Sequence, residues 1–414
     1  MAVALVVVAL GSVRLYAEPD PYGIYFEDNP SVLGTKQDQA DSSTGDQLNS
    51  TTNDPAATLL QNTLLTQNTL QSETASMPPA QDCTLTSSQR SSFESSSTPE
   101  IRKLSGYESL CGGKFMHGSM LFTSMPASPS DAVEMAKDTA MRLKEFARFG
   151  LKPKVILEPL INGQPIDFAA FSRGEHDQSM HSYFDTLASE GITDELLGEV
   201  TSFPEPNIPE WGTTEPNLIA ACITKAAQLQ KAHFPHSLTS VLLDSKSYPS
   251  GTSWEGGQYA SLAPYVAPIP KGLIDSFGLQ GYPWPDPDSV HDPAVFLSAN
   301  QALEAARILN VSRIWFNTGT FRRGVAWNNT TYTLSPSERY TILHNILNEA
   351  QKIRADGVEP EIMLFAENKL DTPEQIDWSY DLSDNGGSGH ANSFKNFQHE
   401  TATLNIPLYI FDTY

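Results

Sequence analysis

The chain has 414 residues and a mass of 45.3 kDa, and 39% of its residues are hydrophobic and 18% charged. Its 26 Lys and Arg against 49 Asp and Glu give a formal net charge of -23. The length excludes a disulfide-stabilised miniprotein, and the charge works against binding to nucleic acid or to anionic lipid, both of which attract cations. A neutral substrate fits this charge better.

The first hundred residues differ from the rest of the chain. Residues 1–17 open with an apolar run from Ala2 to Leu10, which is too short to span a bilayer and predicts a signal peptide or the remnant of a membrane anchor. A buried first strand is the alternative. Residues 18–100 are rich in polar side chains and have no aromatic residue from 29 to 92, so they predict a disordered linker. We therefore expect a secreted or cell-surface protein, tethered to a membrane or cell wall.

Residues 101–414 alternate short apolar runs with helical patterns, which is typical of a parallel β/α fold. Eight such runs over about 300 residues predict a single domain with the (β/α)8 TIM barrel fold. The runs are Phe115 to Leu121, Lys154 to Leu160, Glu199 to Phe203, Ser240 to Asp244, Asp275 to Gly281, Arg313 to Phe316, Ile362 to Ala366 and Leu408 to Phe411.

Helical patterns lie between several of these runs, and the last of them begins with a capping box at Ser335. The helices are expected at 131–148, 216–231, 293–309 and 335–354. A doubly wound open sheet needs the same alternation, but it usually carries a glycine-rich phosphate turn after its first strand. The first run is followed by Phe122-Thr123-Ser124-Met125-Pro126, which has no glycine, so the barrel is preferred.

Catalytic residues of such barrels follow the strands at their carboxyl ends. Glu205 follows the third run and Glu367 follows the seventh. A carboxylic acid that protonates the departing glycosidic oxygen, and a carboxylate that attacks the anomeric carbon or activates water toward it, are the pair that hydrolyses a glycosidic bond. Single glutamates at strand ends are also common as solvated or ion-paired groups, and that is the alternative for both residues.

Aromatic side chains near these positions favour a sugar ligand, because Trp and Tyr stack on the apolar faces of sugars. Trp211 follows Glu205, and Tyr282 and Trp284 follow the fifth run; packing of the barrel is the alternative role. Other candidates for binding substrate hydroxyls lie in or near the ends of runs, and each has a structural alternative. These are Glu158 and His117, with Asp244, Lys246 and Asp412 as weaker candidates.

The stretches 165–177 and 199–212 resemble the family 26 glycoside hydrolases, the endo-β-mannanase group, in which a strand ending His-Glu-Met-Asn-Gly is soon followed by Trp-Gly. The matching residues here are Pro204-Glu205-Pro206-Asn207 and Trp211-Gly212. The resemblance implies a retaining endo-acting hydrolase of mannan-type polysaccharide. In it Glu205 is the acid/base, Asn207 holds the sugar, and Tyr282 hydrogen-bonds the nucleophile.

The resemblance leaves open two ways of numbering the barrel strands. The family carries its acid/base on the fourth strand, whereas Glu205 follows the third run of this chain. If Tyr282 closes the sixth strand, Asn317 takes the place of the nucleophile, and an amide cannot form the glycosyl ester. The protein is then a non-catalytic surface protein whose barrel binds a glycan or a partner. In the simple count of eight runs Glu367 is the nucleophile.

No cofactor and no metal site are predicted. His176 and His181 are five residues apart on an expected helix and do not share a face. Three cysteines are too few for a disulfide framework, although a bridge between Cys83 and Cys111 is conceivable, and Cys222 is expected to be a core thiol. A monomer is expected.

Overall fold

The computed structural model describes residues 118–148, 152–212, 215–248, 256–285, 290–326, 329–366, 368–369, 375–380 and 389–411. The signal segment and the linker predicted at residues 1–100 lie outside this part of the chain. Within the described ranges, no helix combines the length and the apolar character that crossing a membrane requires.

Eight parallel strands form a closed barrel, in the order β1-β14-β11-β8-β7-β6-β5-β2. The barrel closes where β1 pairs with β14, through Gly118 opposite Tyr409. The strands are β1 Gly118–Ser124, β2 Lys152–Glu158, β5 Glu199–Ser202, β6 Leu238–Asp244, β7 Ser276–Gln280, β8 Arg313–Gly319, β11 Glu359–Phe365 and β14 Leu408–Phe411. They correspond to the eight apolar runs in order, so the predicted (β/α)8 barrel is confirmed.

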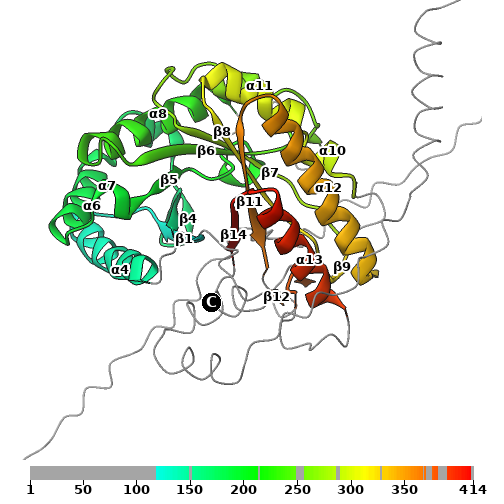
Figure 1. Ribbon diagram of the computed structural model, residues 1–414. Helices are drawn as coiled ribbons and strands as arrows, with labels where there is room; N and C mark the ends of the chain where they lie inside the picture. Colours follow the sequence, from blue (N-terminus) through cyan, green and yellow to red (C-terminus); the bar gives the residue numbers. More distant parts are fainter. Residues whose placement is uncertain are drawn as a thin grey trace, which may run out of the picture.

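Helices surround the barrel on its outside, as Figure 1 shows. The longer ones are α4 Pro129–Arg148, α6 Asp177–Ser189, α8 Pro216–His233, α11 Ala299–Leu309, α12 Pro336–Ala355 and α13 His390–Thr403. Shorter helical turns are α5 Phe168–Ser172, α7 Asp194–Leu197, η1 Pro209–Trp211, α9 Ala263–Val266 and α10 Pro293–Phe296. The expected helix at 293–309 is therefore divided into α10 and α11.

The start of α12 follows the sequence signal closely. The Ser335 hydroxyl accepts from the backbone N–H of Glu338, and the Glu338 carboxylate accepts from the backbone N–H of Ser335 at 2.7 Å. This reciprocal capping box satisfies two backbone donors that the first helical turn leaves without partners.

Cys222 on α8 is a buried free thiol that donates to the carbonyl of Phe168, as expected for a core cysteine.

Charged residues fill the amino-terminal end of the barrel. The ammonium of Lys154 on β2 lies 2.6 Å from Glu199 on β5 and 2.9 Å from Glu361 on β11. Arg313 on β8 pairs with the same two carboxylates. Because β2 and β11 are not neighbours, the contacts between them cross the barrel interior. Lys154 also lies over the ring of Trp315, 5.0 Å from its centroid. We call Lys154, Arg313, Glu199 and Glu361 the lower charge network.

A small sheet is added at the other end of the barrel. Its order is β10-β9-β13-β12, with β9 Arg323–Val325, β10 Thr331–Thr333, β12 Asn368–Lys369 and β13 Ile376–Asp377. A hairpin of β3 Leu160–Ile161 and β4 Gln164–Pro165 follows β2. Arg339 of α12 is fully buried and donates to the carbonyls of Thr320, Trp378 and Ser379, so it joins β8 to the segment after β13.

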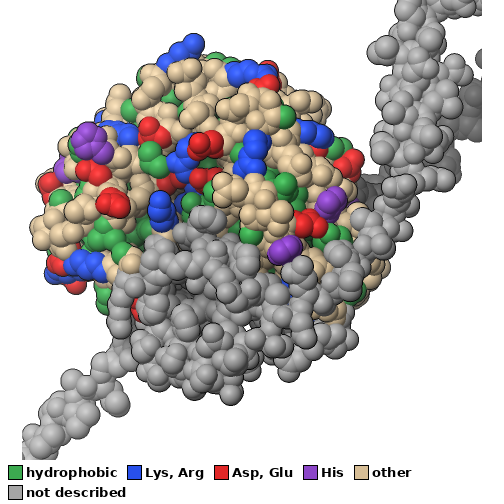
Figure 2. Space-filling model, in the orientation of Figure 1, with side chains coloured by type: hydrophobic (Ala, Val, Ile, Leu, Met, Phe, Trp, Pro, Cys, Tyr) green, Lys and Arg blue, Asp and Glu red, His purple; other side chains and the backbone are tan. Residues whose placement is uncertain are grey.

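The surface seen in Figure 2 carries Lys, Arg, Asp and Glu side chains interspersed among uncharged ones. On this face the acidic residues therefore do not gather into one patch, although the whole chain is strongly acidic.

Candidate active site

Three carboxyl-bearing residues follow neighbouring strands at the carboxyl end of the barrel. Glu158 is the last residue of β2, Glu205 lies three residues beyond β5, and Asp244 is the last residue of β6. These strands are adjacent in the order β6-β5-β2. A fourth carboxyl, that of Glu210, comes from the turn η1 in the same loop as Glu205. The carboxyl end is where barrel enzymes place their chemistry, and we call this end the mouth.

Glu205 is held by an unusual backbone. Phe203 and Glu205 have φ values of 59° and 48°, in the left-handed region that side-chain-bearing residues seldom adopt, and each precedes a proline. The Glu205 N–H donates to the carbonyl of Leu242 on β6 at 2.9 Å. The Glu205 carbonyl accepts from the indole N–H of Trp211 at 3.0 Å. Backbone strain of this kind persists only where surrounding contacts enforce it, and here these contacts hold the backbone that carries the Glu205 side chain.

The Glu205 carboxyl is buried in surroundings that favour its protonated form. Only 3% of the residue is exposed, and its Oε1 atom has no hydrogen-bond partner among the described residues. Burial raises the pKa of Glu205 well above its usual range, and the negative charges of Asp244, Glu210 and Glu158 raise it further. A buried acid that keeps its proton near neutral pH is suited to donate that proton to a substrate.

The Asp244 side chain has hydrogen-bond donors that Oε1 of Glu205 lacks among the described residues. Its Oδ1 atom accepts from the backbone N–H of Lys246 at 2.8 Å and from the hydroxyl of Tyr248 at 3.3 Å. Burial raises the pKa of Asp244 to about 6, while the Lys246 backbone and charge and the Tyr248 hydroxyl act in the opposite direction. With a pKa of about 6, Asp244 is largely ionised at pH 7, and its negative charge is one of those that raise the pKa of Glu205.

Asn207 connects the two loops that carry these acids. Its amide nitrogen donates to the carbonyls of Asp244 at 3.0 Å and Lys246 at 2.8 Å. Its amide oxygen accepts from the Asp244 N–H at 3.0 Å. The residue is fully buried, so both amide protons are used within the protein. The structure thus places Asn207 as a brace between the ends of β5 and β6.

Aromatic residues form the side of the mouth near β7, β8 and β11. The Tyr282 ring lies 5.2 Å from that of Trp378 and 6.4 Å from that of Trp284, all edge-on. The Tyr282 hydroxyl donates to Oδ1 of Asn317 at 3.1 Å, and the Asn317 amide donates to Gln280. Trp378 is buried, as is Trp211, whereas Trp284 is half-buried. Of the predicted sugar-binding aromatics, Trp284 has the most surface available to a ligand.

Strand order corrects one expectation drawn from the family resemblance. The resemblance places the acid/base on the fourth strand, but Glu205 follows β5, the third strand of the barrel, and Tyr282 follows β7, the fifth. The eight described strands close among themselves, so none is needed upstream of β1. The count of eight runs therefore holds, and β11 is the seventh strand. Glu367 comes directly after Ala366 at its end, but Glu367 itself and His117 lie outside the described residues.

The structure places the predicted residues Glu158, Glu205, Tyr282 and Trp284 at the mouth, together with Asp244, a weaker candidate. Sequence reasoning missed Glu210, although this residue is in the same short loop as Glu205. The described residues contain no group of three His, Cys, Asp or Glu side chains arranged to hold a metal ion.

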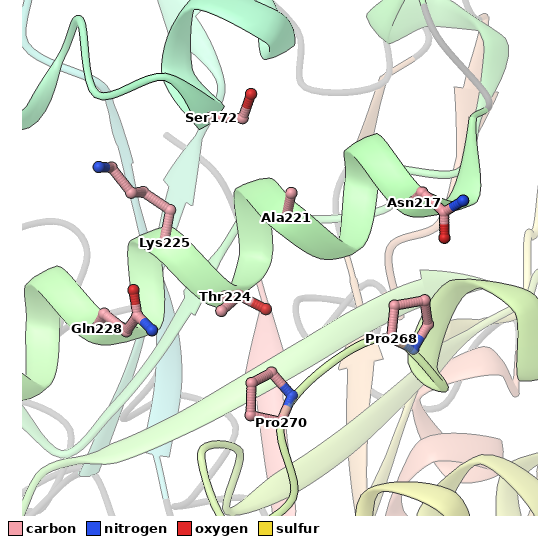
Figure 3. Close-up of a pocket in the computed structure, with 8 residues that line it drawn as sticks. All are labelled: Ser172, Asn217, Ala221, Thr224, Lys225, Gln228, Pro268 and Pro270. Atoms are coloured by element: carbon pink, nitrogen blue, oxygen red, sulfur yellow. The ribbon is translucent and has the colours of Figure 1, made fainter.

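An open groove lies elsewhere, on the outside of the barrel. It runs along the outer face of α8, as Figure 3 shows, with Ser172 on one side and Pro268 and Pro270 on the other. Lys225, which lines it, pairs with Asp177 at 2.7 Å. The carboxyl groups of the mouth do not line this groove, so it forms no part of the candidate site.

Comparisons with known proteins give the following. No protein-family model and no curated protein matches the sequence. Among solved structures, the chain is similar to a β-glucosidase from Thermotoga maritima in complex with castanospermine, with 10% identity and a TM-score of 0.45 over 70% of this chain and 83% of that one. It is also similar to a fungal β-1,4-galactanase, with 13% identity and a TM-score of 0.45 over 68% and 87%. Similarities of this size assign no function.

Proposed function

We propose that this chain is a glycoside hydrolase that acts on β-linked glycans at the mouth of its barrel, with Glu205 as the proton donor. The observation that supports this most is the buried Glu205 carboxyl, whose pKa is raised well above its usual range, whose Oε1 has no described partner and whose backbone is held in a strained conformation. Cleavage of a glycosidic bond needs such an acid, because the departing sugar oxygen must be protonated as the bond breaks.

The sequence adds finer predictions to this proposal. Glu367, after the seventh strand, would be the attacking carboxylate, and the family resemblance makes a neutral mannan-type polysaccharide the substrate. Both stay predictions. Half-buried Trp284 offers an aromatic face to a sugar, and Glu158 offers a carboxylate to its hydroxyls.

The experiment compares Glu205→Gln with the unchanged protein on two kinds of substrate. On polysaccharides such as mannan we expect kcat/KM to fall by about 10²- to 10⁴-fold, because the poor leaving group depends on the acid. On an aryl β-glycoside whose phenolate leaves without protonation, we expect the loss in the bond-breaking step to be much smaller. Glu195→Gln, the same change at an exposed position of α7, is the control. Equal losses on both substrates would contradict the role of Glu205 as the acid.

One observation favours a second candidate, a barrel that binds glycans without cleaving them. Tyr282 donates its hydroxyl to an amide, Asn317, where the resembled family makes this contact to its nucleophile. Glycan binding measured by calorimetry, without release of reducing ends from any polymer, would favour this candidate over hydrolysis.

A further inference from the structure

We propose that Asp244 is a positioning residue for the acid: its carboxylate, held beside Glu205 with the help of Asn207, keeps the proton on Glu205 and so sets the highest pH at which the enzyme cleaves glycans. The inference rests on the proposed function, because it takes Glu205 as the proton donor. It does not depend on which group attacks the sugar, because Asp244 acts on the acid and not on the anomeric carbon.

The backbone places Asp244 and Glu205 side by side. Strands β5 and β6 pair in parallel, with Thr201 opposite Ser240. Beyond the end of β5, the Glu205 N–H donates to the carbonyl of Leu242 at 2.9 Å, so the loop after β5 stays bonded to β6 as far as the acid. Asp244, the last residue of β6, lies two residues beyond this carbonyl. The two side chains therefore leave neighbouring segments at the same end of the barrel.

Asn207, two residues after the acid, ties the two loops together. Its amide makes three hydrogen bonds to backbone groups, two with Asp244 at 3.0 Å and one with Lys246 at 2.8 Å. Because Asn207 is fully buried, breaking these bonds leaves polar groups unpaired inside the protein, which is costly. The fold itself therefore fixes the backbone of Asp244 relative to that of Glu205.

Hydrogen-bond donors hold the Asp244 carboxylate in place. Its Oδ1 atom accepts from the Lys246 N–H at 2.8 Å and from the Tyr248 hydroxyl at 3.3 Å. Tyr248 is itself buried, and its N–H and its carbonyl bond to the hydroxyl of Tyr265 at 3.3 Å and 3.1 Å. Donors to a carboxylate favour its charged form. These contacts oppose the effect of burial and keep a negative charge at a fixed place beside Glu205.

The other charged groups that act on Glu205 are carboxylates as well. Glu210 in η1 and Glu158 at the end of β2 raise its pKa in addition to burial and Asp244. Of the three charges, that of Asp244 has the largest effect, and it is also the one that Asn207 ties to the loop of the acid. The positive charge of Lys246 acts on Asp244 and favours its ionised form.

A second negative charge beside this carboxylate is costly. Where Asp244 is ionised, loss of the proton from Glu205 puts two charges of one sign into a buried place, so Glu205 holds its proton to higher pH. Cleavage needs this proton, and the rate falls once Glu205 has lost it. The alkaline limb of the pH profile is therefore expected to report the pair of acids and not Glu205 alone.

The first experiment compares the pH profile of kcat/KM for the full chain and for Asp244→Asn, on whichever of mannan, xylan and cellulose oligomers the full chain cleaves fastest. Asparagine keeps the shape and an acceptor oxygen of the side chain but loses its charge. We expect similar rates at pH 5, where Asp244 is itself largely protonated. The alkaline limb should move to lower pH by about one pH unit, so that the variant approaches about a tenth of the unchanged rate.

Two further variants separate charge from shape. Asp244→Glu restores the charge one methylene further along the side chain and should return the alkaline limb toward that of the unchanged protein. Asp356→Asn, the same change at an exposed ion pair with Arg307, should leave the profile as it is. An equal loss of rate at every pH in Asp244→Asn, or the same displacement in Asp244→Glu, would overturn the inference and leave the proposed function standing.

A second measurement needs no turnover. In the full chain labelled with carbon-13 glutamate, the Glu205 carboxyl signal, assigned with Glu205→Gln, should titrate about one pH unit lower in Asp244→Asn than in the unchanged protein. An unchanged midpoint would overturn the inference even where cleavage is observed. Absence of cleavage on every glycan would instead overturn the proposed function, and with it the pH limit inferred from it.

Discussion

Glu199 and Glu205 are buried to the same degree at opposite ends of one barrel, with 4% and 3% of their surfaces exposed, yet their acidities move in opposite directions. Burial alone would raise the pKa of both. At the lower end, Lys154 and Arg313 outweigh burial and lower the pKa of Glu199 to about 2. At the mouth, the neighbours that act most on Glu205 are carboxylates, and its pKa rises well above the usual range.

The two ends of the barrel differ in the charges that surround their buried carboxyl groups. In the lower charge network two cations meet two carboxylates across the barrel, and the charges neutralise one another. At the mouth, Asp244, Glu210 and Glu158 add their negative charges to the effect of burial on Glu205, and both effects favour its protonated form. The contrast agrees with the proposed function, in which the lower end stabilises the barrel and the mouth carries the chemistry.

The largest effect is expected from breaking the lower charge network. Lys154→Met leaves Glu199 and Glu361 buried beside a single cation, so the free energy of unfolding should fall by about 3 to 5 kcal/mol in urea titrations. Arg307→Met, which removes one partner of an exposed ion pair, should change it by less than about 1 kcal/mol. Equal losses for the two variants would show that the network contributes no more than a surface pair.

The pH dependence of stability should separate the two ends. Glu199 has a pKa of about 2 in the folded chain, below its ordinary 4.5, so its contribution is present above pH 4.5 and is lost as the pH falls toward 2. Asp244 has a raised pKa of about 6, against an ordinary 3.8, so it costs stability above pH 6 and this cost vanishes as the pH falls toward 3.8. In urea titrations from pH 2 to 8, Glu199→Gln should flatten the lower range and Asp244→Asn the upper one. If Glu199→Gln flattened the upper pH range and Asp244→Asn the lower one, the comparison between the two ends would be refuted.

A smaller effect is expected at the aromatic side of the mouth. Tyr282→Phe removes the hydroxyl that donates to Asn317 and leaves a buried acceptor, which should cost about 1 kcal/mol of unfolding free energy. Thermal unfolding followed by tryptophan fluorescence measures this. If the variant is as stable as the unchanged protein, the hydrogen bond contributes nothing to holding Asn317.

The smallest effect on stability is expected from Glu205→Gln, even though its effect on catalysis should be large. The raised pKa of Glu205 favours its neutral form, and an amide of the same shape replaces it, so the unfolding free energy should stay within about 1 kcal/mol. A loss as large as that of Lys154→Met would mean that Glu205 is a structural acid like Glu199.

The strands and helices could be read from the sequence because their signals are local. Each apolar run and each helical period lies within a few turns of chain, and the capping box at Ser335 is complete within four residues. The place of Glu205 after the third strand followed from the same count. The resemblance to a family moved it to the fourth strand, because a motif carries no information on how many strands precede it.

Local signals in the sequence could not predict the lower charge network or the position of Asp244 beside the loop that carries Glu205. Lys154 and Glu199 are 45 residues apart in the chain and Arg313 and Glu199 are 114 apart, and closure of the barrel alone brings them together. Asn207 was assigned to the sugar because its sequence neighbours match a motif, whereas its three hydrogen bonds to the end of β6 became visible only in the fold.

The most direct test of the account is a titration of the glutamate carboxyl carbons by NMR on the full chain labelled with carbon-13 glutamate, with Glu199→Gln and Glu205→Gln assigning the two signals. The account predicts that Glu199 remains ionised down to about pH 2 and that Glu205 keeps its proton far above the ordinary 4.5. Two signals that titrate together near pH 4.5 would contradict it.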